Sequence, residues 1–197
     1  MIENEISDEQ LIIDYRAGHT GAMDRLLTRY QDRVFQFVLW RTRADRVEGE
    51  DLAQEVLLQV FRSAKSFDGR SRFRTWLYAV AGNVCSRWLR SRSRRPPFEA
   101  NGNAQGESID TLEMPDGTPG AQEALERGER HQAVRSAVRQ LEPQHQVVLL
   151  LRDWEELSYA EISTVLNIPQ GTVKSRLHHA RLRLGKLLSP ATKGEVR

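Results

Sequence analysis

The segment LSYAEISTVLNIPQGTVKSRLHHARLRLGKLL, residues 157–188, constrains the fold of this chain more than any other. Ser158 and Glu161 have the spacing of a capping box, which predicts that a helix begins here. Asn167 suits the left-handed end of that helix, and Pro169 suits the first turn of a second helix. Two helices joined by a turn of three or four residues form a helix-turn-helix.

On a helical wheel, the second helix of this segment has an apolar face and a basic, polar face. The apolar face consists of Val173, Leu177, Ala180, Leu184 and Leu187. The polar side consists of Ser175, His178, His179, Leu182 and Lys186, flanked by Lys174, Arg176, Arg181 and Arg183. A solvated basic face is the simplest interpretation of such a pattern. The capping box, the short turn and the absence of acids from residues 169–188 together favour a helix that lies in the major groove of DNA.

The rest of the chain is organised around further helical patterns. Hydrophobic periodicity predicts four helices, at residues 8–17, 23–38, 50–64 and 72–92. The helical pattern returns from about residue 123. Residues 96–122 contain five acids, no Lys or Arg, and many Pro, Gly and Asn residues, a composition that cannot bury enough apolar surface to fold alone. We therefore predict an all-α protein with two small helical domains joined by a flexible acidic linker. A simple spacer is the alternative interpretation of the linker.

Two of the N-terminal helices carry features that a structural role alone does not require. The helix of residues 72–92 places Trp76, Asn83, Arg87 and Arg90 on one face, which suits an unstacked single strand of nucleic acid. Core packing for the tryptophan and a solvated helix end for the arginines explain the pattern equally well. In the helix of residues 50–64, Leu58 projects outward and resembles a protein-docking hot spot, although a single exposed leucine is common. It is surrounded by Asp51, Gln54, Glu55 and Arg62.

Composition argues against several other classes of protein. The single cysteine, Cys85, excludes an internal disulfide and a cysteine-based zinc cluster. The longest apolar run, residues 147–151, is far shorter than the roughly 20 residues of a membrane span, and the acidic N-terminal sequence predicts no signal peptide. The spacing of a metal site is absent from the histidines His131, His145, His178 and His179. The carboxylates are not clustered as metal-assisted catalysis requires. We expect a cytoplasmic protein without enzymatic activity, cofactor, metal or stable membrane insertion.

Three stretches in this order resemble one protein family. The chain resembles the extracytoplasmic function (ECF) sigma factors of bacterial RNA polymerase over nearly its whole length. The stretches that carry the resemblance are GEDLAQEVLLQVF, SFDGRSRFRTWLYAVAGNVCSRWLRSRSRR and LSYAEISTVLNIPQGTVKSRLHHARLRL. The resemblance implies a domain at residues 1–95 that binds core polymerase and melts and reads the −10 element. It also implies a linker at residues 96–122 that threads toward the polymerase cleft, and a domain at residues 123–197 that reads the −35 element.

The resemblance also implies roles for individual residues. The docking surface for core polymerase consists of Asp51, Gln54, Glu55 and Leu58. Capture of the single-stranded −10 non-template strand is assigned to Phe67, Arg70, Arg72, Trp76, Asn83, Arg87 and Arg90. Contacts with duplex −35 DNA are assigned to Ser158, Tyr159, Thr172, Lys174, Ser175, Arg176, His178, His179 and Arg181. An anti-sigma factor is an expected further partner.

Two positions depart from the family pattern. His179 stands where arginine is frequent, which is expected to affect base preference and to add pH sensitivity to the contact. Gly82 stands where a bulkier or basic residue is common, which is expected to weaken the strand contact. The alternative function is that of a conventional helix-turn-helix regulator, which binds duplex DNA alone and does not replace a sigma factor.

Overall fold

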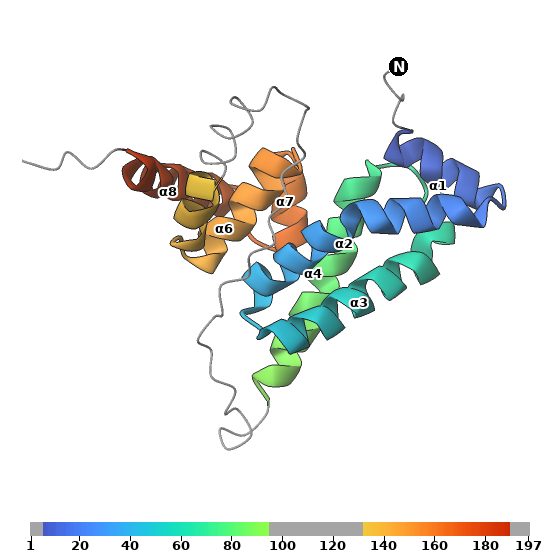
Figure 1. The fold of residues 1–197 in the computed structure, drawn as a ribbon, viewed down its shortest axis with the longest axis horizontal. Coiled ribbons are helices and arrows are strands. Elements are labelled where there is room, and N and C mark those ends of the chain that lie inside the picture. Colours follow the sequence, from blue (N-terminus) through green and yellow to red (C-terminus); the bar gives the residue numbers. More distant parts are fainter. Residues whose placement is uncertain (1–5, 95–131, 190–197) are drawn as a thin grey trace, which may run out of the picture.

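The computed structural model describes residues 6–94 and 132–189, and these residues form helices and no strand, as predicted. The first group consists of α1 (Asp8–Arg16), α2 (Thr20–Thr42), α3 (Arg46–Ser63) and α4 (Phe73–Arg92), with a short 3-10 turn at Ala64–Ser66. The second group begins with a helical stretch at residues 132–139. It continues through α6 (Pro143–Leu149), a π-helical turn at Leu150–Trp154, α7 (Tyr159–Leu166) and α8 (Gln170–Leu188). Figure 1 shows the two groups side by side. The predicted linker, residues 96–122, lies outside the described residues.

Local capping signals explain where the helices begin. Ser7 caps α1 by accepting a hydrogen bond from the backbone amide of Gln10. The spacing of Ser7 and Gln10 predicts a full capping box, but the Gln10 side chain bonds forward to Asp14 instead of back to the cap, so only half of the box forms. The α3 helix begins at Arg46, four residues earlier than predicted, because the Asp45 side chain caps it by accepting from the Glu48 amide. Gly18, with φ +104°, ends the first helical segment in the left-handed region.

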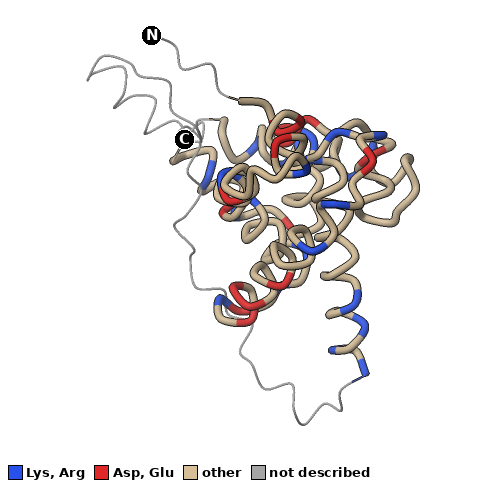
Figure 2. The backbone as a smooth tube through the Cα atoms, turned by 90° about the vertical axis from the view of Figure 1, so that its right-hand side faces the viewer, with Lys and Arg blue, Asp and Glu red and all other residues tan. Residues whose placement is uncertain are grey.

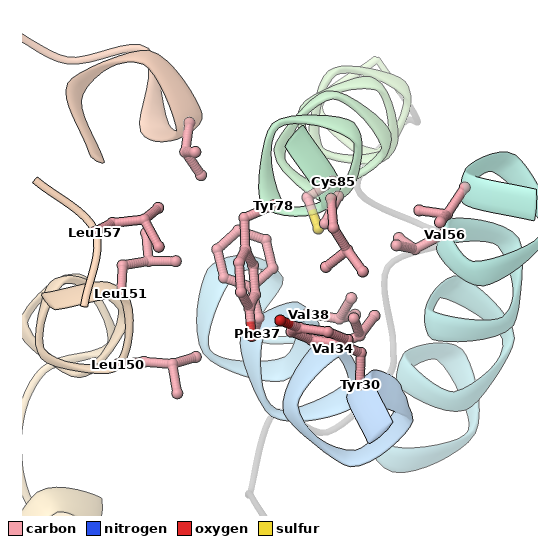
Figure 3. Packing of buried hydrophobic residues seen from close by; sticks show 14 of the residues in the cluster. Tyr30, Val34, Phe37, Val38, Val56, Tyr78, Cys85, Leu150, Leu151 and Leu157 are labelled. Atoms are coloured by element: carbon pink, nitrogen blue, oxygen red, sulfur yellow. The ribbon is translucent and has the colours of Figure 1, made fainter. Parts of the chain in front are cut away.

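The helices share one continuous apolar core that extends across both groups. Tyr30, Phe37, Phe73 and Tyr78 are buried at the centre of the first group, where the Phe37 and Tyr78 rings meet edge to face at 5.3 Å. Figure 3 shows Leu150, Leu151 and Leu157 of the second group pointing toward Tyr78 and Phe37. The contacts between the groups run mainly from α7 to α4 and from α6 to α2. Among the described helices, none has the length and apolar character that a membrane crossing requires.

Candidate nucleic-acid interface

The helix-turn-helix forms through the capping box that the sequence predicts. The Glu161 backbone amide donates to the Ser158 hydroxyl (3.2 Å), and the Ser158 amide donates to the Glu161 carboxylate (2.7 Å). Asn167 ends α7 with a left-handed φ of 53°, and Pro169 precedes the first residue of α8. The Ser163 hydroxyl donates to the Ile168 carbonyl (2.6 Å), which ties the turn to α7. Local hydrogen bonds therefore hold the angle at which α8 leaves the turn.

The α8 helix presents the two faces that its sequence pattern predicts. Val173, Leu177 and Ala180 are buried, whereas the opposite face is open to solvent. The exposed predicted DNA contacts on α8 are Lys174, Ser175, His178, His179 and Arg181. Thr172 and Arg176 are half-buried at the edge of this face. An exposed face with cations, hydroxyls and imidazoles offers donors to both phosphates and base edges.

Some members of this predicted set already have intramolecular partners. Arg181 forms a 2.6 Å ion pair with Asp153, whose hydrogen bond raises the pKa of the guanidinium above its ordinary value. The Arg152 guanidinium lies 5.3 Å from the centre of the Tyr159 ring, and the Ser158 hydroxyl is occupied as a helix cap. These residues support the shape of the motif in addition to any contact with DNA.

The histidine pair on α8 belongs to a small cluster of imidazoles. The rings of His178 and His179 are 5.7 Å apart, and the ring of His145, near the start of α6, lies 6.5 Å from that of His179. Among the described residues, no group of His, Cys, Asp and Glu side chains has the arrangement of a metal site. The cluster therefore adds hydrogen-bonding groups to the exposed face of α8.

The predicted strand-capture residues divide into buried and exposed sets. Phe67 is only 3% exposed, and its ring packs on Phe73 and Trp76 at 5.9 and 5.3 Å, so it supports the loop and is covered in this conformation. The sequence pattern did not reveal this burial, because an aromatic residue in a loop suits either role. Trp76 is half-buried beside it, whereas Arg70 and Arg72 are exposed.

The remaining strand-capture residues lie along α4. Asn83, Arg87 and Arg90 are exposed, and Figure 2 shows the basic residues along the part of α4 that leads into the grey trace. Arg87 forms a 2.8 Å ion pair with Glu55 of α3. An open pocket of about 520 Å³ between α4 and α7 brings these three α4 residues together with Thr164 and Asn167. The structure therefore places this part of the predicted set against the helix-turn-helix.

The predicted docking surface lies on the outer side of α3. Leu58 is 53% exposed, and Asp51, Gln54 and Glu55 around it are exposed as well. Sequence reasoning missed Phe61, which is 43% exposed, lies one helical turn after Leu58, and contacts the Tyr15 ring at 6.0 Å. The spacing of three residues between two large apolar side chains was the available signal. Together, Leu58 and Phe61 form an apolar patch with an acidic border.

Comparison with known proteins identifies the family of the chain. Residues 26–95 match the family model for Sigma-70 region 2, and residues 131–184 match the model for Sigma-70, region 4. The chain is 33% identical to the RNA polymerase sigma-H factor of Pseudomonas aeruginosa, over 93% of this chain and 94% of the relative. It is 28% identical to the ECF RNA polymerase sigma-E factor of Escherichia coli K12, over 96% of this chain and 98% of the relative.

Two solved structures have a similar fold. One is CnrH in complex with the cytosolic domain of CnrY, with a TM-score of 0.54, 20% identity, and coverage of 92% of this chain and 96% of that one. The other is the sigma factor RpoE of Bartonella quintana in complex with the anti-sigma factor NepR, with a TM-score of 0.55, 21% identity, and coverage of 85% and 97%. The chain is also 30% identical to the ECF RNA polymerase sigma-E factor of Haemophilus influenzae, over 94% of this chain and 97% of the relative. Because both family models match in order and relatives of 30% and 33% identity align along nearly their full length, this chain belongs to the ECF family of RNA polymerase sigma factors.

Proposed function

We propose that this sigma factor divides its work among three helices: α3 binds core RNA polymerase, α8 reads the −35 element, and α4 captures the unwound −10 strand. The observation that carries the proposal is the outer face of α8. It is exposed and stands on a capped helix-turn-helix, and the segment of residues 169–188 that forms it has five Lys or Arg and no acid. Most of this face has no apolar contact to make within the fold, and its composition suits the major groove.

Docking on core polymerase is assigned to the apolar patch of α3. Leu58 and Phe61 expose a large part of their side chains, whereas most large apolar residues of the first group are buried. A central apolar contact bordered by Asp51, Gln54 and Glu55 has the composition of a binding hot spot for a basic or mixed partner surface. The domain of residues 1–95 would thereby hold polymerase on one side and DNA on the other.

Strand capture is assigned to α4 and the loop before it. Arg70, Arg72, Arg87 and Arg90 offer cations for the backbone of a single strand, and Asn83 offers an amide for a base edge. Phe67 would act by fixing the loop, because its ring is buried against Phe73 and Trp76. The domain of residues 123–197 would then read duplex DNA upstream, and residues 96–122 would connect the two domains.

An anti-sigma factor is the proposed regulatory partner. Both structures with a similar fold contain a bound second protein, and one of those proteins is named an anti-sigma factor. A regulator that covers the Leu58–Phe61 patch would block the proposed polymerase contact. The proposed place of action is the cytoplasm, where polymerase and promoters are found.

The proposal is tested by mixing the purified full chain with bacterial core RNA polymerase and following complex formation by native gel and light scattering. Run-off transcription on genomic promoter fragments then follows. A stable complex that starts transcription at discrete sites supports the proposal and yields the promoter sequence. Tight duplex binding by the chain alone, without any complex with core enzyme, would identify a conventional helix-turn-helix regulator instead.

A further inference from the structure

The backbones of the two groups of helices approach each other closely at Gly82. A Cβ atom at this position would lie 2.4 Å from the backbone carbonyl oxygen of Val165 in α7. A backbone carbonyl cannot move aside as a flexible side chain can, so the contact requires glycine. Glycine within a helix costs about 1 kcal/mol relative to alanine. The residue that departs from the family pattern is therefore the one that allows α7 to lie directly on α4.

This contact covers part of the proposed strand-capture surface. The pocket that contains Asn83, Arg87 and Arg90 has Thr164 and Asn167 of α7 in its opposite wall. A nucleic-acid strand that lies along this face of α4 would have to occupy space that α7 fills. The arrangement in the free chain and the proposed strand complex therefore compete for the same surface.

Hydrogen bonds hold the two groups together around the Gly82 contact. The Thr75 hydroxyl of α4 donates to the Glu161 carboxylate of α7 at 2.7 Å. The Arg74 guanidinium donates to the backbone carbonyl of Glu155 at 3.1 Å and lies 3.4 Å from the Glu156 carboxylate. Two carboxylates and one backbone carbonyl of the second group are thus held by two consecutive residues, Arg74 and Thr75, at the start of α4.

The Glu155 carboxylate is the unusual member of this interface. It is 1% exposed, and neither of its oxygens accepts a hydrogen bond from the described residues. The nearest cation is Arg33 of α2, with its Nη1 atom 3.7 Å from Oε1. The other groups that face it are Arg74 and Tyr78 of α4 and Asp8 of α1, and Tyr30 of α2 lies in the same network. The Tyr78 hydroxyl is close enough to lower the pKa of this carboxylate, but the two groups do not have the geometry of a hydrogen bond. The hydroxyl has no other hydrogen-bond partner among the described residues.

We propose that the α4–α7 contact is an intramolecular latch that covers the strand-capture surface in the free chain, and that Glu155 makes the latch sensitive to pH. The proposal rests on the assignment of strand capture to α4. Closing the latch removes an ionised carboxylate from water without full compensation by hydrogen bonds, which opposes closure. Opening returns Glu155 to water, which offsets part of the free energy that a competing partner needs to separate the two groups.

The direction of the pH effect follows from this burial. Desolvation raises the pKa of Glu155 in the closed state, against partial compensation by Arg33, Tyr78 and Arg74. The closed state therefore binds a proton more tightly than the open state does. Acidification strengthens the latch as the pH falls through the raised pKa, and the effect is complete below the ordinary value of 4.5. Above the raised pKa, the latch stays at its weakest.

The test measures the separation of the two groups in the full chain, without polymerase, by fluorescence energy transfer between dyes at Ile13→Cys and Lys186→Cys. We expect Gly82→Ala to lower the ratio of closed to open molecules about tenfold, because the added methyl group meets a backbone carbonyl. Gly21→Ala is the matched control, because a Cβ atom there meets nothing within 4 Å. Glu155→Lys, which places a cation beside Arg33 and Arg74, is a second opening variant if Gly82→Ala fails to fold.

Glu155→Gln tests the pH dependence separately. It keeps the size of the side chain but has no charge to bury, so it is expected to stay equally closed as the pH is lowered from neutral toward 4.5, while the wild-type chain closes further as the pH falls through the raised pKa of Glu155. Equal energy transfer in wild type, Gly82→Ala and Glu155→Lys would overturn the latch. A wild-type pH response in Glu155→Gln would overturn the role of Glu155. Failure of the wild-type chain to bind core polymerase would instead contradict the proposed function, whatever the dyes report.

Discussion

The carboxylate of Glu161 joins the cap of α7 to Thr75 of α4. One of its oxygens accepts from the Ser158 backbone amide and the other from the Thr75 hydroxyl, both at 2.7 Å. Desolvation raises the pKa of Glu161, but these hydrogen bonds lower it more, and the net direction is downward. Glu161, which completes the capping box of α7, thus also holds the helix-turn-helix against the first group of helices.

Thr75→Val is expected to lower the free energy of unfolding by about 1 kcal/mol, since a half-exposed hydrogen bond to a charged acceptor is lost. The lowered pKa of Glu161 contributes stability above its ordinary value of 4.5, and this contribution is lost as pH falls through the lowered pKa. The variant should therefore differ most from wild type at neutral pH. Urea unfolding at pH 7 and pH 4 measures both effects. Thr164→Val is the control, because its hydroxyl bonds only to the Ala160 carbonyl in its own helix, and an equal loss in both variants would contradict the coupling.

Leu58→Asp is expected to weaken binding to core polymerase by on the order of 2 kcal/mol or more, because it places a charge at the centre of the apolar patch. Phe61→Ala should act in the same direction. A fluorescence titration with core enzyme gives the dissociation constants. Ile13→Asp, at another exposed apolar position on α1, should bind as wild type does. Unchanged affinity in Leu58→Asp would exclude this face of α3 as the docking surface.

Lys174→Ala and Ser175→Ala are expected to reduce transcription from promoters that depend on the −35 element, while affinity for core polymerase stays the same. Both side chains lie on the exposed face of α8, and loss of one good base contact costs about 1–3 kcal/mol. Run-off transcription from matched and substituted −35 sequences measures the effect. Lys186→Ala removes the same charge near the end of α8 and serves as the control. If Lys174→Ala and Lys186→Ala behave alike, the face has been assigned incorrectly.

The Cys85 thiol is expected to resist alkylation in the folded chain. It is fully buried, and burial raises its pKa to about 12, so very little thiolate is present at pH 8. Iodoacetamide labelling followed by mass spectrometry should show slow modification in buffer and rapid modification in denaturant. A native rate within about tenfold of the denatured rate would mean that the first domain opens far more often than its packing suggests.

The local elements could be predicted from the sequence because their signals lie within a few residues. The capping box of Ser158 and Glu161, the left-handed Asn167 and the two faces of α8 all depend on neighbours in the chain. The start of α3 was predicted too late because hydrophobic periodicity begins inside the helix, whereas the Asp45 cap lies before it.

The relation between the two groups could not be predicted in this way. Gly82 is buried on the side of α4 that receives α7, next to the backbone of Val165. That burial depends on residues more than 70 positions away. Thr75 and Glu155 have roles across the interface but are unremarkable in type, so no local pattern reveals them. Gly82 stands out in the sequence only by its departure from the family pattern, which does not indicate what it contacts.

The ion pair between Glu55 and Arg87 links two surfaces that are assigned to different partners. A polymerase group that attracts Glu55 would release Arg87 for a phosphate, and a phosphate that attracts Arg87 would release Glu55. Thermodynamic linkage requires the two effects to be equal in size, so the order of arrival does not matter. One exposed pair of charges would thereby make each of the two macromolecules a weak allosteric effector of the other.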